Sequence, residues 1–118
     1  MYKTISVIGG DLRIVNLIEL LAKDDFLVYT YGLENSEDII ESENIKRCAS
    51  IQELIGSSEI ILGPVPMTND SKNISAPFSD EKIPIDEIIT EMSNKNKIFI
   101  AGKLTEKVTT KLQEGNIK

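Results

Sequence analysis

Hydrophobic and polar positions change their period twice along the first thirty residues. Thr4–Ile8 is mostly β-branched, which suits a buried strand, and the run stops at two glycines. Across Asp11–Lys23 the apolar residues fall on one broad helical face. Phe26–Tyr31 is again aromatic and β-branched, and it stops at Gly32. The pattern predicts a strand, a helix and a parallel strand joined by a right-handed crossover.

Shorter apolar runs and helix caps continue this alternation. Ser50 with Glu53 has the spacing of a capping box, and Pro84 suits the first turn of a helix. Further strands are expected at Ile45–Ala49 (a short extended piece), Glu59–Leu62 and Lys97–Ala101. Further helices are expected at Ile51–Ile55, Pro84–Met92 and Leu104–Gln113, while Ser36–Ile40 fits either a short helix or a solvated connection.

The alternation predicts an α/β domain with three layers, of the flavodoxin-like or Rossmann-like class, and a parallel sheet of four or five strands. We prefer the flavodoxin-like strand order, because the first strand then lies centrally between Phe26–Tyr31 and Glu59–Leu62. The 118 residues fit a single domain, 1–118.

Composition and charge remove several function classes. The net charge is −6, which argues against a nucleic-acid partner, since such surfaces need clustered Lys and Arg. The chain has no histidine, the commonest general base and transition-metal ligand, so we expect no metal site. The single Cys48 fits a reducing compartment and is expected to be a half-buried filler. Without a long apolar run or a signal-peptide pattern, we expect a cytoplasmic protein with no membrane contact.

Candidate chemistry gathers where the predicted strands end. Gly9-Gly10, Gly63-Pro64 and Ala101-Gly102 each follow a strand, and in open α/β sheets ligands bind outside the carboxyl ends of strands. Plain turns explain each glycine equally well. The first turn is not a dinucleotide fingerprint, because Asp11 and Ile14 stand where two of its glycines belong. We therefore expect this domain to bind no cofactor by itself.

Arg13 lies in the first turn of the predicted helix, where its planar fork suits a carboxylate. Alternatively, it forms a surface ion pair with Asp11, the predicted helix cap, or with Glu19. Thr68 and Asn69 belong to a polar loop that either adds ligand contacts or is merely solvated. The candidate substrate-binding residues are Gly9, Gly10, Asp11, Arg13, Gly63, Thr68 and Asn69, and no catalytic residue is assigned.

Four segments, taken together, resemble one known family. Ile5–Arg13, a strand that runs into Gly-Gly-Asp-x-Arg, resembles the opening of the dipicolinate synthase A subunit. Three further segments resemble parts of the same family: Ile60–Pro66, Pro77–Ile83 and Ile98–Gly102. The first of them is an apolar strand followed by a proline-containing loop. The resemblance covers essentially the whole chain but only the N-terminal part of the family's usual chain.

The resemblance implies a flavodoxin-like N-terminal domain. The family's C-terminal dinucleotide-binding domain, which would carry NAD(P), is missing from this chain, which stops at Lys118. It also implies an oxidoreductase of sporulating bacteria. The A subunit works with a flavoprotein-like B subunit in the cytoplasm of the mother cell, and together they make dipicolinate from a dihydrodipicolinate-pathway precursor. The isolated domain is expected to be inactive.

Two functions follow from these observations. In the first, the domain forms one wall of a substrate cleft, and Arg13 with the glycine turn holds a carboxylate of a pyridine or dihydropyridine dicarboxylate. In the second, it is a non-catalytic docking module for the B subunit of dipicolinate synthase or for a second copy of itself. The loop Met67–Phe78, with Met67, Ile74 and Phe78, would then be the interface.

Overall fold

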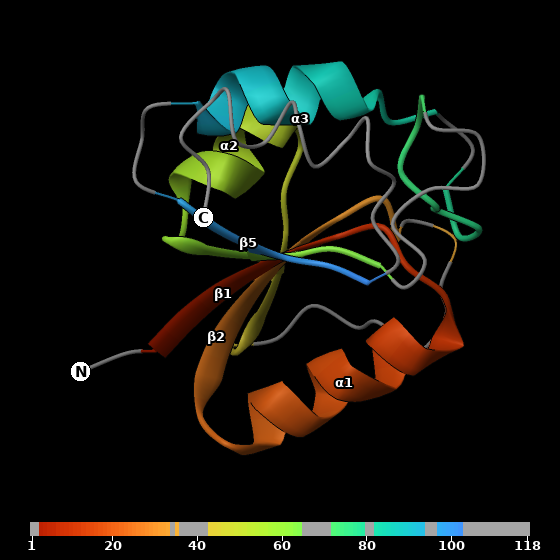
Figure 1. The fold of residues 1–118 in the computed structure, drawn as a ribbon. Helices are drawn as coiled ribbons and strands as arrows, with labels where there is room; N and C mark the ends of the chain where they lie inside the picture. Colours follow the sequence, from red (N-terminus) through yellow and green to blue (C-terminus); the bar gives the residue numbers. More distant parts are fainter. Residues whose placement is uncertain are drawn as a thin grey trace.

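The computed structural model describes residues 3–33, 35, 43–64, 72–79, 82–93 and 97–102. Helices and strands alternate along the chain (Figure 1). The elements are β1 (Lys3–Ile8), α1 (Leu12–Lys23), β2 (Phe26–Tyr31), β3 (Ile45–Arg47), α2 (Ile51–Gly56), β4 (Ile60–Leu62), α3 (Ile85–Met92) and β5 (Ile98–Ile100). The predicted helix Leu104–Gln113 and the segment Ser36–Ile40 lie outside the described residues.

The five strands form one parallel sheet in the order β3-β2-β1-β4-β5. The predicted fold class is confirmed, and β1 lies between the two strands expected beside it. The flavodoxin-like order is corrected in one respect, since β3 pairs outside β2 and gives the 3-2-1-4-5 order of a Rossmann sheet. Lys46 and Arg47 are exposed on β3, and charged residues of this kind suit an edge strand.

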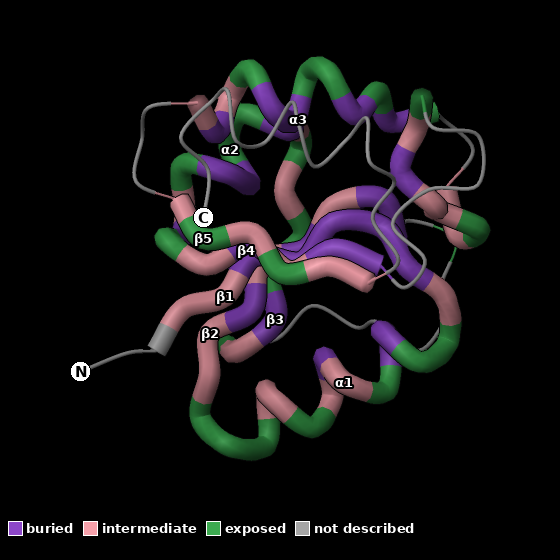
Figure 2. Tube along the Cα trace, in the orientation of Figure 1, coloured by how far each residue is buried: buried purple, intermediate pink, exposed green. Residues whose placement is uncertain are grey.

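Helices cover both faces of the sheet, as Figure 1 shows, with α1 on one face and α2 and α3 on the other. Each face buries its own apolar cluster, and the buried strands run between them (Figure 2). On β1, Val7 belongs to the α1 face and Ile8 to the α2–α3 face, as the pleat of a strand requires. The buried Ser6 hydroxyl donates to the carbonyl oxygen of Leu54 at 2.7 Å and so ties β1 to α2.

Local signals in the sequence explain where the helices begin. The Asp11 carboxylate caps α1 by accepting from the N–H of Arg13 at 3.0 Å. The Ser50 hydroxyl caps α2 by accepting from the N–H of Glu53 at 3.1 Å. The Glu53 carboxylate reaches back to the N–H of Ala49, one residue before its partner in a standard capping box. Within the described ranges, no helix combines the length and apolarity needed to cross a bilayer.

Candidate functional site

The two glycines after β1 form a tight turn that the protein itself fills. Gly9 and Gly10 have φ of +67° and +106°, a region that disfavours any side chain. The N–H of Gly9 donates to the carbonyl oxygen of Tyr31 at 2.8 Å, and that of Gly10 donates to Ser75 at 2.9 Å. A Cβ on Gly9 would lie 2.6 Å from the Ile74 side chain. The turn therefore shapes the sheet edge, and both of its N–H groups serve internal hydrogen bonds.

Asp11 and Arg13 project from this turn as an ion pair. The Arg13 Nη2 lies 2.9 Å from Asp11 Oδ2, and Nε lies 3.2 Å from the same oxygen. The Arg13 side chain is 68% exposed. The hydrogen bond from Arg13 is the main reason that the pKa of Asp11 is lowered, and the same bond raises the pKa of Arg13. The predicted surface pair with Asp11 is confirmed, and it holds the guanidinium at the start of α1.

Gly63 follows β4, next to β1, so the structure brings it to the same sheet edge as the glycine turn. Its N–H donates to the carbonyl oxygen of Ile100 at 2.7 Å. A Cβ there would lie 2.9 Å from the Phe99 ring and 3.2 Å from Ala101, so packing alone explains this glycine. Thr68 and Asn69 lie outside the described residues. Ligand binding by the seven candidate residues remains a prediction.

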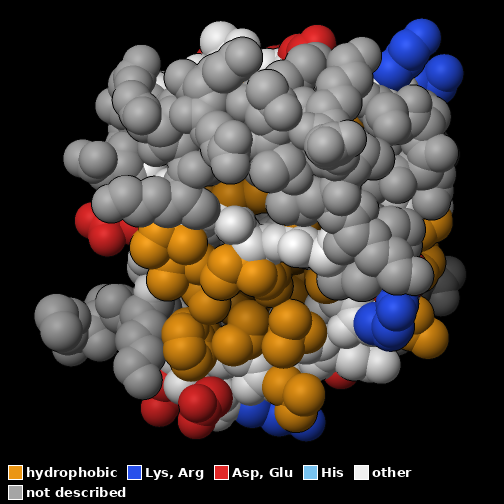
Figure 3. Space-filling model, in the orientation of Figure 1, with side chains coloured by type: hydrophobic (Ala, Val, Ile, Leu, Met, Phe, Trp, Pro, Cys, Tyr) orange, Lys and Arg blue, Asp and Glu red, His pale blue; other side chains and the backbone are white. Residues whose placement is uncertain are grey.

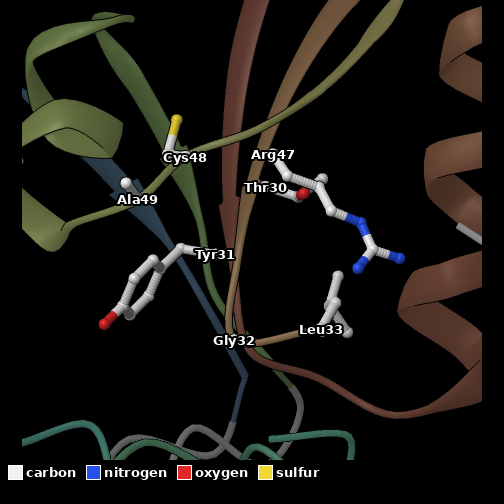
Figure 4. A pocket seen from close by; sticks show the side chains of 7 residues that line it. All are labelled: Thr30, Tyr31, Gly32, Leu33, Arg47, Cys48 and Ala49. Atoms are coloured by element: carbon white, nitrogen blue, oxygen red, sulfur yellow. The ribbon is translucent and has the colours of Figure 1, made fainter. Parts of the chain in front are cut away.

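A pocket that we did not predict lies at the carboxyl ends of β2 and β3 (Figure 4). Its volume is about 190 Å³, and its lining residues are Thr30, Tyr31, Gly32, Leu33, Arg47, Cys48 and Ala49. Thr30 and Arg47 are partners in the strand register. Both side chains point toward the α1 face, whereas Tyr31 and Cys48 point the other way. A sequence signal for this pocket did exist, because β2 is followed by Gly32 just as β1 is followed by Gly9.

The hydroxyl of Thr30 is the unusual group in this pocket. Thr30 is only 1% exposed, and its Oγ1 has no hydrogen-bond partner among the described residues. Leaving a buried hydroxyl unpaired costs about 1–3 kcal/mol, and valine has nearly the same shape. A threonine here is therefore unfavourable for folding unless something else bonds to its hydroxyl.

The Cys48 thiol is almost entirely protonated at neutral pH, which makes it a weak nucleophile. Burial raises the pKa of its thiol to about 11; the negative charge of Glu53 adds to this effect, and a hydrogen bond with Ser57 opposes it. Its side chain packs against the core on the α2–α3 face. The prediction of a half-buried filler is confirmed.

The opposite, amino-terminal edge of the sheet carries a more open pocket of about 540 Å³. Lys97 lies there and donates through Nζ to the carbonyl oxygen of Ser58 at 2.6 Å. Ser58 is buried, and its Oγ has no partner in the part of the chain that the structure describes. The same part contains no group of three or more His, Cys, Asp or Glu side chains placed to hold a metal ion.

Comparisons with known proteins place this geometry in context. The family model for the N-terminal domain of the dipicolinate synthase A subunit matches residues 4–118. Among curated proteins, nothing matches the chain. Solved structures are also similar to it, among them two chains of dipicolinate synthase. Dipicolinate synthase A chain from Bacillus subtilis has a TM-score of 0.79 at 21% identity, over 100% of this chain and 39% of that one.

The second structure is the dipicolinate synthase A subunit from Bacillus halodurans. Its TM-score is 0.76 at 20% identity, over 98% of this chain and 39% of that one. At such identities the likeness shows a shared fold. The chain thus spans well under half the length of either solved chain.

Proposed function

Because this chain belongs to the family of dipicolinate synthase A-subunit N-terminal domains, we propose that it forms one wall of the substrate cleft in an intact synthase. The observation that carries the proposal is the exposed guanidinium of Arg13, which Asp11 holds in place at the carboxyl edge of the sheet. Ligands of open α/β sheets bind outside this edge. The positive end of the α1 dipole adds to the attraction for an anion.

The ligand in this proposal is a pyridine or dihydropyridine dicarboxylate. One of its carboxylates pairs with the Arg13 fork and competes with Asp11 for it. Gly9 and Gly10 shape the turn beside Arg13, but neighbouring side chains fill the space at both glycines and their N–H groups are already bonded inside the protein. The second carboxylate of the ligand would then face the opposite wall of the cleft, which this domain does not supply.

The same proposal assigns the reaction to the intact enzyme. The solved relatives are much longer than this chain, which leaves room for a dinucleotide-binding domain. NAD(P) on that domain would accept the electrons when a dihydrodipicolinate-pathway precursor is oxidised to dipicolinate during sporulation. The B subunit of the synthase would be the partner, the mother-cell cytoplasm the location, and the 118-residue chain alone would be inactive.

Calorimetric titration of the intact protein with dipicolinate tests the role of Arg13. We expect Arg13→Ala to weaken binding by about ten- to a hundredfold, because a charge-assisted fork is lost. Lys23→Ala is the matched control, since it removes an exposed cation from the other end of the same helix. Equal affinity of the wild type and Arg13→Ala would overturn the carboxylate role.

A docking function is the second candidate, and β5 favours it. Ile98 and Ile100 on β5, the last strand of the described sheet, are 40% and 51% exposed. Figure 3, in the orientation of Figure 1, shows hydrophobic side chains gathered on the face of the molecule where β5 lies. The structure gives no such support for docking through the loop Met67–Phe78, because Ile74 of that loop is buried against Gly9. Residues 67–71 of that loop lie outside the described ranges.

The docking candidate has its own test. The double substitution Ile98→Thr and Ile100→Thr keeps the β-branched shape and removes apolar surface. Co-purification of the double variant with the synthase's B subunit, together with its sedimentation alone, should show weakened association. Undiminished association in both measurements would count against docking through β5.

A further inference from the structure

We propose that the chain pairs with a second copy of itself, and that α1 of each copy packs on the exposed side of β4 and β5 of the other. The inference names the partner of the docking candidate above, on which it rests. The observation that carries it concerns the large apolar side chains that are exposed among the described residues. All four lie on the α1 side of the sheet, and they are Leu12, Leu20, Ile98 and Ile100.

The α1 side of β4 and β5 is apolar, and no helix covers it within the described ranges. Phe99 packs into the core on the α2–α3 face, so the pleat directs its neighbours Ile98 and Ile100 to the α1 side. Their register partners, Ile60 and Leu62, point the same way. We call this surface the β4–β5 step. Parallel strands that are apolar on both sides are typical of sheets that are covered on both faces.

The helix α1 leaves this step uncovered because it packs elsewhere on the same face. It shares its buried cluster with residues of β1, β2 and β3, the half of the sheet away from β5. Figure 3 shows hydrophobic side chains gathered on the face of the molecule where β5 lies. The step therefore lacks one layer of the fold, and that layer has the thickness of a helix.

The outer side of α1 has the character that the step requires. Leu20 is 63% exposed and stands almost opposite Ile14 and Ile18, which α1 buries against its own sheet. A helix with apolar side chains on its outer as well as its inner side is suited to lie between two sheets. The chain therefore already carries the helix that its own β4–β5 step would accept.

The two surfaces fit each other by symmetry. α1 stands above the sheet by about one helix diameter, about 10 Å, next to the uncovered step (Figure 1). A two-fold axis parallel to the strands turns a second copy over and sets its α1 on the step of the first. The same rotation sets α1 of the first copy on the step of the second. Both contacts are then identical, as in the isologous interfaces of homodimers.

Charges at the rim of this contact are complementary. The axis keeps the amino edges of both sheets on one side, where α1 ends at Lys23 and Glu59 directly precedes β4. Both side chains are exposed, and neither forms an ion pair within the described ranges. Lys97, the other cation at this edge, donates to the carbonyl oxygen of Ser58. Lys23 of one copy thus faces Glu59 of the other.

The size of the contact predicts a weak dimer. α1 has 12 residues, so it is about 18 Å long and about 10 Å wide. Two reciprocal contacts of this size remove roughly 700–1,000 Å² of accessible surface in total, less than the ~1,200–2,000 Å² of stable complexes. The chain should therefore exchange between monomer and dimer at high micromolar concentrations.

Sedimentation equilibrium of the 118-residue chain tests the pairing, at loadings from about 20 µM to about 1 mM. We expect the weight-average mass to rise with concentration from 13.1 kDa toward twice that value. Leu20→Lys and Ile98→Glu should each weaken association at least about tenfold, because each buries an unpaired charge at both contacts. Gln52→Lys and Gln52→Glu are the matched controls and should leave it unchanged. They make the same charge changes at an exposed position of α2, on the other face of the sheet.

Mixing the Leu20→Lys and Ile98→Glu variants identifies the contact. Leu20 lies near the end of α1 and Ile98 begins β5, so the axis brings the two to the same amino edge. In a mixed dimer the new lysine meets the new glutamate at one contact, and the other contact is native on both sides. Association of the mixture should return to within about threefold of the wild type. An unfolded variant could not be rescued in this way.

Several outcomes would overturn the pairing. A chain that stays monomeric to about 1 mM would do so, and so would a mixture that associates no more than its two components. Equal losses in the Gln52 controls would reduce the effect to net charge and refute it as well. Capture of the synthase's B subunit separates this failure from that of docking as a whole. If Ile98→Glu weakens capture of a monomeric chain, docking through β5 stands with another occupant; if it does not, the docking candidate fails too.

Discussion

At the scale of single residues, the glycine turn after β1 limits what the chain tolerates. Gly9 combines a left-handed backbone with a side-chain position occupied by Ile74 at 2.6 Å and by the carbonyl oxygen of Ser75 at 2.8 Å. Sequence reasoning identified this turn from its two glycines. It did not show that residues 74–76 fill it, because that contact joins segments more than sixty positions apart.

We expect Gly9→Ala to lower the free energy of unfolding by about 2–4 kcal/mol, since backbone strain and overpacking act together. Urea denaturation of the purified chain measures this. Gly56→Ala is the control, because nothing lies within 4 Å of its side-chain position at the end of α2. That change should be neutral or stabilising by up to about 1 kcal/mol. Similar effects of both substitutions would show that Gly9 is not packed as described.

The Asp11–Arg13 pair predicts a pH dependence of stability. The folded pKa of Asp11 lies below its ordinary value of 3.8, so the charged form stabilises the folded state above that value. This contribution is lost as the pH falls through the lowered pKa. Asp11→Asn keeps a good helix cap and removes the charge. Its unfolding free energy should fall below that of the wild type at pH 7, and the two should converge in strong acid. If the two unfolding free energies still differed in strong acid, the difference would come from the helix cap and not from the charge of Asp11.

Cys48 predicts unusually slow alkylation. With a pKa of about 11, its thiolate fraction at pH 8 is roughly two orders of magnitude below that of an ordinary cysteine. It is the sequence's single cysteine, so mass spectrometry reads the reaction with iodoacetamide directly. The rate should rise strongly in urea, where the thiol is solvated. Equal native and unfolded rates would contradict the burial.

At the scale of elements, the hydrophobic periods and caps were sufficient to predict β1, α1, β2, α2, β4, α3 and β5 to within one or two residues. These elements depend on local patterns, and each cap is made by residues close in sequence. The short extended piece expected at Ile45–Ala49 is confirmed as β3. Its place in the sheet was not predictable, because a strand of three residues has too few side chains to show which neighbour it pairs with. The pocket beside it was missed for the same reason.

Buried hydroxyls on neighbouring strands predict opposite effects of substitution. Ser6 on β1 donates to the carbonyl oxygen of Leu54, so Ser6→Ala should destabilise the fold by about 1–2 kcal/mol. Thr30 on β2 bonds to nothing among the described residues, so Thr30→Val should be neutral or stabilising by up to about 2 kcal/mol. Denaturant midpoints of the two variants decide this. A large loss for Thr30→Val would reveal a partner for that hydroxyl.

At the scale of the whole molecule, the fold class and the family were readable from the sequence. The alternation of strands and helices indicated the fold class, four segments together resembled the family, and the family match then covers residues 4–118. The candidate site was readable only in part. The sequence offered two roles for Arg13, a ligand carboxylate partner or a surface ion pair, and the structure shows the pair with Asp11. The packing roles of Gly9 and Gly63 required three-dimensional contacts.

A thermal-shift titration tests the function of this chain as a unit. A ligand that binds only the folded state raises the melting temperature by mass action. We expect dipicolinate to raise it and NADPH to leave it unchanged, since the first turn lacks a dinucleotide fingerprint. Stabilisation by NADPH would contradict that view of the turn. No response to dipicolinate would place the carboxylate site outside this chain.

The central place of β1 in the sheet has a consequence for how the protein is made. β1 leaves the ribosome first, and β2 covers one of its edges soon afterwards. Its other edge pairs with Ile61 and Leu62, which are translated more than fifty residues later. At about 5–20 residues per second, that edge waits roughly 3–10 s for its partner. During synthesis, the central strand of the sheet is therefore open along one edge, for several seconds, to pairing with another nascent chain.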